Sequence, residues 1–527
     1  MANLDPRRDE TIVTRYLLRT RAESAPTALF AAFPEDNVGW TWADADEVAN
    51  RAANALSALG VGRGSVLAVA DSNSRMLIAA FLGAAKLGAV ITPLNPAYRG
   101  DLLRHALAVL EPCLLIGGEP SLLNEARAIQ ELPVKLIPAT GEDSFEQHLQ
   151  AASPAECPDP GIRFFDPYGI IMTSGTTGPS KGVLSSYAQL FAMIEHTLLR
   201  HIGPEDTVLC DVPLFHVSGL INIAASLQTG AALAIYRRFD AETYWDRVKR
   251  HRVTHATFMP ALATRLSAAA PSLEDRTHSI SSAMCGPAWK GWDAFCERFG
   301  LTDVYSFYNM TELSSPLGRR AGDGSDASSC GRVRPGAQVR IVDEHDLEIP
   351  VGAVGELLVR TDLPWEMNSG YVSMPQATTL AWRNGWFHTG DMFRRNEAFD
   401  YFYVDRLKDS IRRSGENISS FEVESAILTF PEINDVAVVA AADDRTGEEV
   451  RAFVVSKPSA SFDPANLIAH LTTRLPDYMV PRYVTAIREL PQNSTGKVDK
   501  NYLRSVPVTP ETWDRRKQDP ARGERRR

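Results

Sequence analysis

The stretch IIMTSGTTGPSKGVLSS, from Ile170 to Ser186, has the residue types of a phosphate-binding loop. Glycines let a backbone turn tightly, hydroxyls and backbone N–H groups donate to phosphate oxygens, and Lys181 adds a positive charge. A Walker A loop needs glycine directly before its lysine and a hydroxyl residue directly after it. Here Ser180 precedes the lysine and Gly182 follows it. The loop therefore predicts nucleotide phosphate binding of another kind.

The elements around this loop are those of an α/β protein. From Trp40 to Ile235 the sequence alternates between helix-period and strand-like runs. The run DEVANRAANALSALG has apolar residues on one helical face and stops at Gly60, and SVLAVA then has the pattern of a buried strand. Such alternation predicts parallel sheets covered by helices. We expect a large N-terminal domain of mixed or parallel sheets flanked by helices.

The pattern of apolar and turn-forming residues changes twice after this region. From Ser329 to Tyr403, short alternating strands with Gly and Pro turns predict a β-rich subdomain. Beyond Asp405, a helical segment, two strand-like segments and a second helical segment follow in order and predict a small α+β unit. We therefore expect an N-terminal domain at residues 1–404, a small mobile α+β C-terminal domain at 405–505, and a polar, basic tail at 506–527.

Composition limits the class of protein. A chain of 527 residues is too long for one ordinary core, and 44% hydrophobic with 23% charged residues is typical of a globular protein. The formal net charge of -10 argues against a nucleic-acid partner. The apolar stretch from Met76 to Leu94 is interrupted by Lys86 and contains Pro93 near its end, so it predicts a core helix and a buried strand, with no membrane span.

The six cysteines lie far apart and lack the spacing of metal ligands. They indicate a reduced, cytoplasmic protein with ordinary buried thiols. The start of the chain has no charged region followed by an apolar run, as a secretory signal would require.

The loop sequence TSGTTGPSKG resembles the phosphate-binding signature of the adenylate-forming superfamily, which includes acyl-CoA synthetases, peptide-synthetase adenylation domains and firefly luciferase. The resemblance extends in order from about Trp40 to Arg504. Its further motifs are PLFHVSG (213–219), YNMTE (308–312), GWFHTGD (385–391), VDRLKD (404–409), RSGENISSFEVE (413–424) and NSTGK (493–497).

The resemblance implies a role for each residue of the nucleotide site. Glu312 is expected to ligate Mg²⁺, with Thr311 beside it on the α-phosphate of ATP. Tyr308 offers a flat face to adenine, and its alternative role is that of a buried core tyrosine. Asp391 suits the ribose hydroxyls, and Arg406 is a second ribose contact. The residues expected at the β- and γ-phosphates are Thr173, Ser174, Gly175, Thr176, Thr177, Gly178 and Lys181.

Further roles concern the two half-reactions of the superfamily. Lys497 is expected at the oxygens of ATP and of the carboxylate during adenylation. Lys408 matches the hinge about which the small domain rotates, after which Gly415 and its neighbours in SGEN line the route of a thiol. His216 is expected near the substrate carboxylate in the acyl pocket, and a packed structural histidine is the alternative.

The resemblance implies an acid:CoA ligase that forms acyl-AMP from a carboxylic acid and ATP, releases pyrophosphate, and passes the acyl group to CoA. Mg²⁺ is the expected cofactor, and ATP and CoA are co-substrates. SGENISSFEVE and PQNSTGKVDKNYLR most resemble the carnitine and crotonobetaine CoA ligase-like branch, which favours a small or medium polar acid.

Three alternatives stay open at the level of the sequence. The acceptor can be a carrier-protein thiol, an amine or an inorganic nucleophile in place of CoA. A catalytically silent nucleotide-binding scaffold is a second alternative, which the retention of Lys181, Glu312, Asp391, Arg406 and Lys497 disfavours. A homodimer is compatible with the sequence, as is a monomer.

Overall fold

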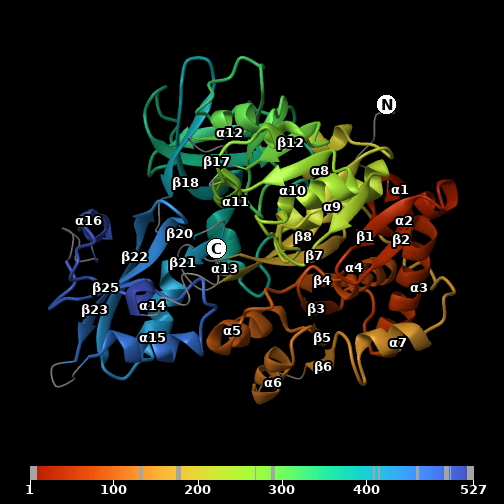
Figure 1. The fold of residues 1–527 in the computed structure, drawn as a ribbon, viewed down its shortest axis with the longest axis horizontal. Helices are drawn as coiled ribbons and strands as arrows, with labels where there is room; N and C mark the ends of the chain where they lie inside the picture. Colours follow the sequence, from red (N-terminus) through yellow and green to blue (C-terminus); the bar gives the residue numbers. More distant parts are fainter. Residues whose placement is uncertain are drawn as a thin grey trace. The chain divides into compact units, whose positions relative to one another are not determined.

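The computed structural model of the chain describes residues 9–129, 134–173, 180–267, 269–286, 291–406, 410–413, 416–457, 462–491, 498 and 500–518. Its contacts divide the chain into two compact units (Figure 1). The first unit takes residues 1–96, 107–173 and 182–405, and the second takes residues 97–106, 174–181 and 406–527.

A mainly parallel sheet carries the strand that leads into the phosphate-loop motif. The strands from β6 to β7 in this sheet pair in parallel, as the alternation of helices and strands predicts. Its strand order is β6 (Lys135–Pro138), β5 (Leu114–Gly117), β3 (Val66–Ala70), β4 (Val90–Pro93), β7 (Pro167–Thr173) and β8 (Lys181–Ser186).

A second, larger sheet carries the YNMTE and PLFHVSG motifs. It is parallel from β1 to β13 and antiparallel where β2, β14 and β15 are added. Its strand order is β15 (Arg332–Val333), β14 (Leu317–Arg320), β13 (Asp303–Tyr308), β12 (Ser282–Cys285), β11 (His255–Phe258), β9 (Thr207–Cys210), β10 (Ala232–Ile235), β1 (Leu29–Phe33) and β2 (Val38–Thr41).

Helices pack between these two sheets. One core cluster joins residues of both sheets to α2 (Thr14–Ser24), α3 (Trp42–Ala58), α4 (Arg75–Leu87), α8 (Tyr187–Glu195) and α9 (Val217–Thr229). Helices α4, α8 and α9 are buried along nearly their whole length, as expected for helices that are apolar on all sides, and caps fix the helix ends. Thr41 and Asp44 form a capping box at the start of α3, and Gly88, with a φ of 67°, ends α4.

The other helices before residue 405 belong to the first unit, except that α5 begins in the second unit. They are α1 (Asp9–Ile12), α5 (Gly100–Leu110), α6 (Pro120–Ala128), α7 (Phe145–Ala151), α10 (Tyr244–His251), α11 (Pro260–Ser267), α12 (Trp292–Phe299) and α13 (Pro375–Ala381), with 3₁₀ turns η1 (Leu198–His201), η2 (Leu273–Arg276) and η3 (Arg383–Gly385).

The β-rich region predicted after Ser329 forms an antiparallel sheet of its own. Its strands follow chain order, as expected for successive hairpins. They are β16 (Ala337–Val342), β17 (Gly355–Thr361), β18 (Phe387–Arg395) and β19 (Tyr401–Arg406). Strand β18 carries Asp391, so this sheet positions one of the predicted nucleotide contacts.

The second unit contains an α+β core in which α14 (Ser420–Leu428) and α15 (Pro464–Thr472) pack on a mixed sheet. Strands β22 (Ile433–Asp443) and β23 (Gly447–Ser456) form its long antiparallel pair. The remaining elements are β20 (Ser410–Arg413), β21 (Glu416–Ser419), β24 (Tyr483–Ala486), β25 (Trp513–Asp514), α16 (Lys500–Ser505) and α17 (Arg515–Gln518).

Two expectations from composition meet the structure here. The six cysteines are free thiols, but the expectation that all are buried is wrong for Cys113, whose side chain is exposed. Cys113 directly precedes β5, where the chain leaves the surface, so its side chain is not yet covered. Across the described residues, every helix is too short or too polar to cross a bilayer.

Candidate active site

Glu312 lies in a loop whose backbone is held at four successive carbonyls. Strand β13 ends at Tyr308, and the chain then turns through residues 309–316 into β14. The side-chain amide of Gln189 donates to the carbonyls of Thr311 and Leu313, at 2.9 and 3.1 Å. The backbone and side-chain N–H groups of Asn368 both donate to the carbonyl of Glu312, each at 3.0 Å.

The fourth carbonyl, that of Ser314, accepts from Nε of Arg334 at 3.1 Å. Arg334 is itself fixed by the carboxylate of Glu366 at 3.1 Å. Asn309 accepts from the backbone N–H of Ser315 at 2.8 Å and steadies that residue at a φ of 51°. Because these backbone groups are satisfied within the protein, the loop is preorganised before any ligand binds.

The Glu312 side chain is buried, with 5% of its surface exposed, and points toward Tyr371. The Tyr371 hydroxyl donates to Oε1 of Glu312 at 2.9 Å. Burial, the Glu312 charge and this hydrogen bond all raise the pKa of Tyr371, so the hydroxyl stays protonated and keeps donating. The hydrogen bond from Tyr371 therefore fixes the orientation of the Glu312 carboxylate.

This donor set fits the Mg²⁺ that the resemblance implies. Mg²⁺ in nucleotide enzymes is commonly held by one or two carboxylates, with phosphates and water as its other ligands. Within the described residues, no three His, Cys, Asp or Glu side chains converge on one point. Glu312 would thus be a protein ligand, and the nucleotide would supply others.

Tyr308 and Asp391 meet across two sheets. The Tyr308 hydroxyl donates to Oδ2 of Asp391 at 2.7 Å, and both side chains are buried. Phe393 packs edge-on against the Tyr308 ring, with 4.9 Å between centroids. This pair places the end of β13 beside the middle of β18, and so brings together two of the residues predicted to contact the nucleoside.

Polar contacts of strand β18 orient Asp391. Glu356 on β17 accepts from the backbone N–H of Gly390 at 2.9 Å and contacts His388 at 3.0 Å. Thr389 donates to the carbonyl of Leu357 at 2.7 Å and accepts from the backbone N–H of Asp391 at 3.1 Å. The hydrogen bonds within and around the GWFHTGD motif therefore fix the position of its final aspartate, Asp391.

The remaining predicted residues fall into three groups. His216 is the N-cap residue of α9, half-buried, with its ring 4.6 Å from that of Phe215. Thr173 ends β7, Lys181 begins β8, and Arg406 ends β19. Outside the described residues lie Ser174, Gly175, Thr176, Thr177, Gly178, Lys408, Gly415 and Lys497.

The structure adds three residues that the sequence did not single out: Gln189, Asn368 and Tyr371. Gln189 lies in the first turn of α8, whose cap, Ser186, accepts from its backbone N–H at 3.1 Å. Asn368 and Tyr371 flank Gly370, which has a φ of 113°. The one sequence signal available was this Asn-Ser-Gly-Tyr turn with its glycine.

Two protein-family models match the chain. The model described as AMP-binding enzyme matches residues 18–372, and the model of the AMP-binding enzyme C-terminal domain matches residues 422–497. The chain belongs to the AMP-binding enzyme family, whose members form adenylates, as its motifs predict.

Individual relatives agree with this placement. A crotonobetaine/carnitine–CoA ligase from Escherichia coli is 29% identical over 482 residues, which cover 88% of this chain and 93% of that protein. An o-succinylbenzoate CoA synthetase from Bacillus subtilis, solved as a double mutant with a product analogue, matches with a TM-score of 0.83 at 23% identity and covers 93% of this chain and 98% of that one. An amide bond synthetase from Marinactinospora thermotolerans matches with a TM-score of 0.79 at 26% identity, over 93% and 99% of the two chains.

Proposed function

We propose that this protein activates a carboxylic acid with ATP to form acyl-AMP and pyrophosphate, and then transfers the acyl group to the thiol of CoA. The observation that carries the proposal is the immobilised Glu312 carboxylate in the first unit of an AMP-binding enzyme. The Tyr308–Asp391 pair supports a nucleoside site in the same unit.

In the first half-reaction, an oxygen of the acid attacks the α-phosphorus of ATP, and the bond from that phosphorus to pyrophosphate breaks. Mg²⁺ offsets phosphate charge when it is bound. Glu312 would hold the metal, Thr311 contacts the α-phosphate, and Asp391 accepts from the ribose hydroxyls. Lys181 and Lys497 add positive charge at the phosphates and at the attacking oxygen.

In the second half-reaction, the CoA thiolate attacks the acyl carbonyl carbon and AMP leaves with both of its electrons in the broken bond. The C-terminal domain rotates about Lys408 between the two steps, and the SGEN segment around Gly415 then lines the thiol route. The match to the C-terminal domain model over residues 422–497 supports this part of the proposal.

The identity of the acceptor has one competing candidate. The amide bond synthetase that this chain resembles at 26% identity favours an amine as the nucleophile that receives the acyl group. The crotonobetaine/carnitine–CoA ligase, at 29% identity and with similar coverage of both chains, favours CoA and a small or medium polar acid. We place CoA first because the motif resemblance also favours that branch.

The test is a panel of carboxylic acids scored by pyrophosphate release with ATP and Mg²⁺, with and without CoA. The proposal expects release with at least one polar acid, faster turnover on adding CoA, and a thioester detected by mass spectrometry. Good turnover without any thioester would indicate that another acceptor receives the acyl group. No pyrophosphate release with any acid would remove the adenylation proposal itself.

A further inference from the structure

The loop that carries His216 is anchored by a buried asparagine, Asn73. The loop runs from Asp211, directly after β9, to His216, directly before α9. Asn73 lies in the turn between β3 and α4, with 5% of its surface exposed, and is 139 residues away from Val212 in the sequence. Strand β3 belongs to one sheet and β9 to the other, so Asn73 links the two sheets of the first unit.

The side-chain amide of Asn73 makes three hydrogen bonds to backbone groups. Its N–H groups donate to the carbonyls of Val212 and Tyr236, at 2.9 and 3.0 Å. Its oxygen accepts from the backbone N–H of Leu214 at 2.8 Å. Both N–H groups and the oxygen are thus paired inside the protein, which matches the donors and acceptor of an amide. Asn73 therefore fixes the backbone on both sides of Pro213.

The turn that presents Asn73 is itself held by its neighbours. Ser74 caps α4 by accepting from the backbone N–H of Leu77 at 3.1 Å, and its hydroxyl donates to Asp71. Asp71 also accepts from the backbone N–H of Ser72 at 2.8 Å. Because the turn is tied to the start of α4, the Asn73 side chain is preorganised to hold the loop.

The first turn of α9 holds the same loop through a close contact. A Cβ added to Gly219 would lie 2.4 Å from the carbonyl oxygen of Pro213 and 2.8 Å from Cα of Leu214, so this approach requires glycine. The backbone N–H of His216 also donates to the carbonyl of Pro213, at 3.1 Å. His216 therefore follows a segment that both Asn73 and α9 hold.

Burial divides the loop into a fixed base and a partly exposed end. Val212 and Leu214 are 2% and 0% exposed, whereas Phe215, His216 and Val217 are half-buried. The loop follows the carboxyl end of β9, and ligands of parallel α/β sheets bind beyond the carboxyl ends of the strands. A rigid base with an accessible end is the usual arrangement of a binding loop.

Other residues hold the nucleotide contacts. The hydrogen bonds that fix Glu312 and Asp391, described above, involve neither Asn73 nor residues 211–216. A change at Asn73 should therefore affect the acid more than the nucleotide.

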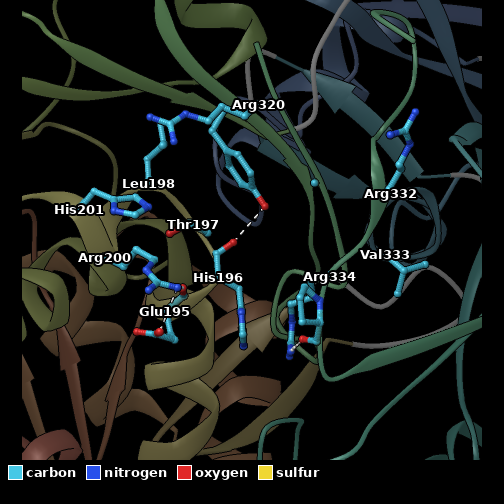
Figure 2. A pocket seen from close by; sticks show the side chains of 13 residues that line it. Glu195, His196, Thr197, Leu198, Arg200, His201, Arg320, Arg332, Val333 and Arg334 are labelled. Atoms are coloured by element: carbon cyan, nitrogen blue, oxygen red, sulfur yellow. Dashed lines mark hydrogen bonds and ion pairs between the residues drawn. The ribbon is translucent and has the colours of Figure 1, made fainter. Parts of the chain in front are cut away.

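A cavity of about 410 Å³ elsewhere in the first unit is lined by none of the residues that Asn73 contacts (Figure 2). The four arginines in its wall each pair with a carboxylate, so these arginines bring no uncompensated charge that would attract an acid. The carboxylates are those of Glu195, Asp303, Asp400 and Glu366. Charge therefore does not favour this cavity over the loop of His216 as the site of the acid.

We propose that Asn73 is a positioning residue for adenylation, which holds the loop of residues 211–216 so that His216 meets the carboxylate of the acid. The proposal rests on the proposed function and on the expected place of His216 beside that carboxylate. Asn73 acts through the backbone of Val212 and Leu214 and is not itself a catalytic residue. A displaced loop would bind the acid less tightly, while the contacts of ATP would stay in place.

Initial rates of pyrophosphate release by the full chain, with the best acid of the panel, test the proposal. Asn73→Ala should raise KM for the acid at least tenfold and leave KM for ATP within twofold of the parent. An unchanged KM for the acid, or an equal rise of both KM values, in a folded Asn73→Ala variant would overturn the proposal.

Asn73→Asp separates hydrogen bonding from packing. It keeps the size of the side chain and the acceptor for Leu214, but it places an oxygen against the two carbonyls. At pH 8 it should therefore raise KM for the acid at least as much as Asn73→Ala does. If Asn73→Asp were the milder change, packing would explain the effect and the hydrogen-bond assignment would be wrong.

Asn50→Ala is the matched control, because Asn50 is a buried asparagine of the same unit, 6% exposed, whose amide donates to Asp46 at 3.2 Å. It should change neither KM. If Asn73→Ala does not fold, as judged by circular dichroism, Gly219→Ala takes its place, since the added methyl group displaces the carbonyl of Pro213. The same rise in KM for the acid alone is expected, and its absence would contradict the proposal.

Hydrogen–deuterium exchange followed by mass spectrometry gives a readout that needs no substrate. In Asn73→Ala, peptides that cover residues 210–220 should exchange at least tenfold faster than in the parent, because the N–H of Leu214 loses its acceptor. Peptides around Glu312 should not change. Unchanged exchange at 210–220 would refute the anchor, whether or not an acid is found. If no acid released pyrophosphate from the parent, the adenylation proposal would fail on its own evidence.

Discussion

At the scale of single residues, the site depends on how Glu312 is held. Its main-chain carbonyl is fixed by Asn368 and its carboxylate by the Tyr371 hydroxyl. Neither partner is near it in sequence, and both arrive from the segment before α13. A carboxylate placed in this way can bind a metal ion without a large rearrangement, because its orientation is already set.

Two variants separate the charge of Glu312 from its orientation. Glu312→Gln removes the metal-binding charge and should lower pyrophosphate release at least a hundredfold, about 3 kcal/mol of transition-state stabilisation. Tyr371→Phe keeps the charge but removes one hydrogen bond to it, so we expect about a tenfold loss and a higher Mg²⁺ concentration for half-maximal rate. Initial rates across a Mg²⁺ series measure both effects.

The control is Tyr305→Phe, which removes a tyrosine hydroxyl from the same region that donates to a backbone carbonyl. It should leave the Mg²⁺ dependence unchanged. If Tyr371→Phe behaved like this control, the assigned role of the Tyr371 hydroxyl would be wrong.

Asp211, which follows β9 and precedes the PLFHVSG motif, lowers the stability of the folded protein at neutral pH. It is buried, and its Oδ2 has no hydrogen-bond partner among the described residues. Burial raises its pKa to about 6, although the Arg247 charge and a backbone hydrogen bond oppose this. The folded state thus favours the protonated acid, and stability is lost as the pH rises from about 4 toward 6.

Asp211→Asn removes this cost. The variant should be more stable than the parent by about 2 kcal/mol at pH 7, and the gain should shrink as the pH falls toward 4. Denaturant unfolding at several pH values measures the difference, with the exposed Asp246→Asn as control. A gain that is independent of pH, or a loss at pH 7, would show that Asp211 is stabilised in its charged form.

At the scale of elements, α16 begins three residues after Lys497 in the sequence and is anchored to two other elements of the second unit. Lys500, the first residue of α16, contacts Glu424 on α14 at 2.7 Å and donates to the Ser420 hydroxyl at 2.8 Å. Glu424 also accepts from the backbone N–H of Val438 on β22 at 2.7 Å. Three elements of the second unit therefore meet three residues beyond Lys497.

Lys500→Met keeps the length of the side chain and removes its charge. We expect the free energy of unfolding to fall by about 1 to 2 kcal/mol, because a largely buried Glu424 loses its partner. Adenylation, measured as ATP–pyrophosphate exchange, should fall about tenfold, because Lys497, with its proposed role at the oxygens of ATP, precedes this anchor by only three residues in the sequence. Lys457→Met alters an exposed lysine of the same unit and should change neither quantity. If the Lys500→Met variant were destabilised but kept normal ATP–pyrophosphate exchange, the contacts of Lys500 would have no part in adenylation.

At the scale of the whole molecule, the fold follows from the pattern of the sequence better than the site does. Alternating helical and strand-like runs predict the parallel sheet around β3 and β4, and hairpin patterning predicts β16 to β18, because both patterns are local. The contacts of Glu312 with Asn368 and Tyr371 span 56 and 59 residues. Such contacts depend on how the larger sheet meets the β-rich region, which no local pattern specifies.

Cys113 shows the same limit, since an ordinary thiol next to a buried strand gives no local sign of its exposure.

The central claim is that the carboxylate oxygen of an acid attacks the α-phosphorus of ATP. The most direct measurement uses the best acid of the panel, labelled with ¹⁸O in its carboxylate, together with ATP, Mg²⁺ and CoA, and mass spectrometry of the released nucleotide. Acyl-AMP formation predicts AMP that carries one ¹⁸O, because the oxygen that joined the acid to phosphorus leaves with AMP when the thiol attacks. Release of ADP with ¹⁸O in inorganic phosphate, or of unlabelled AMP, would contradict the account.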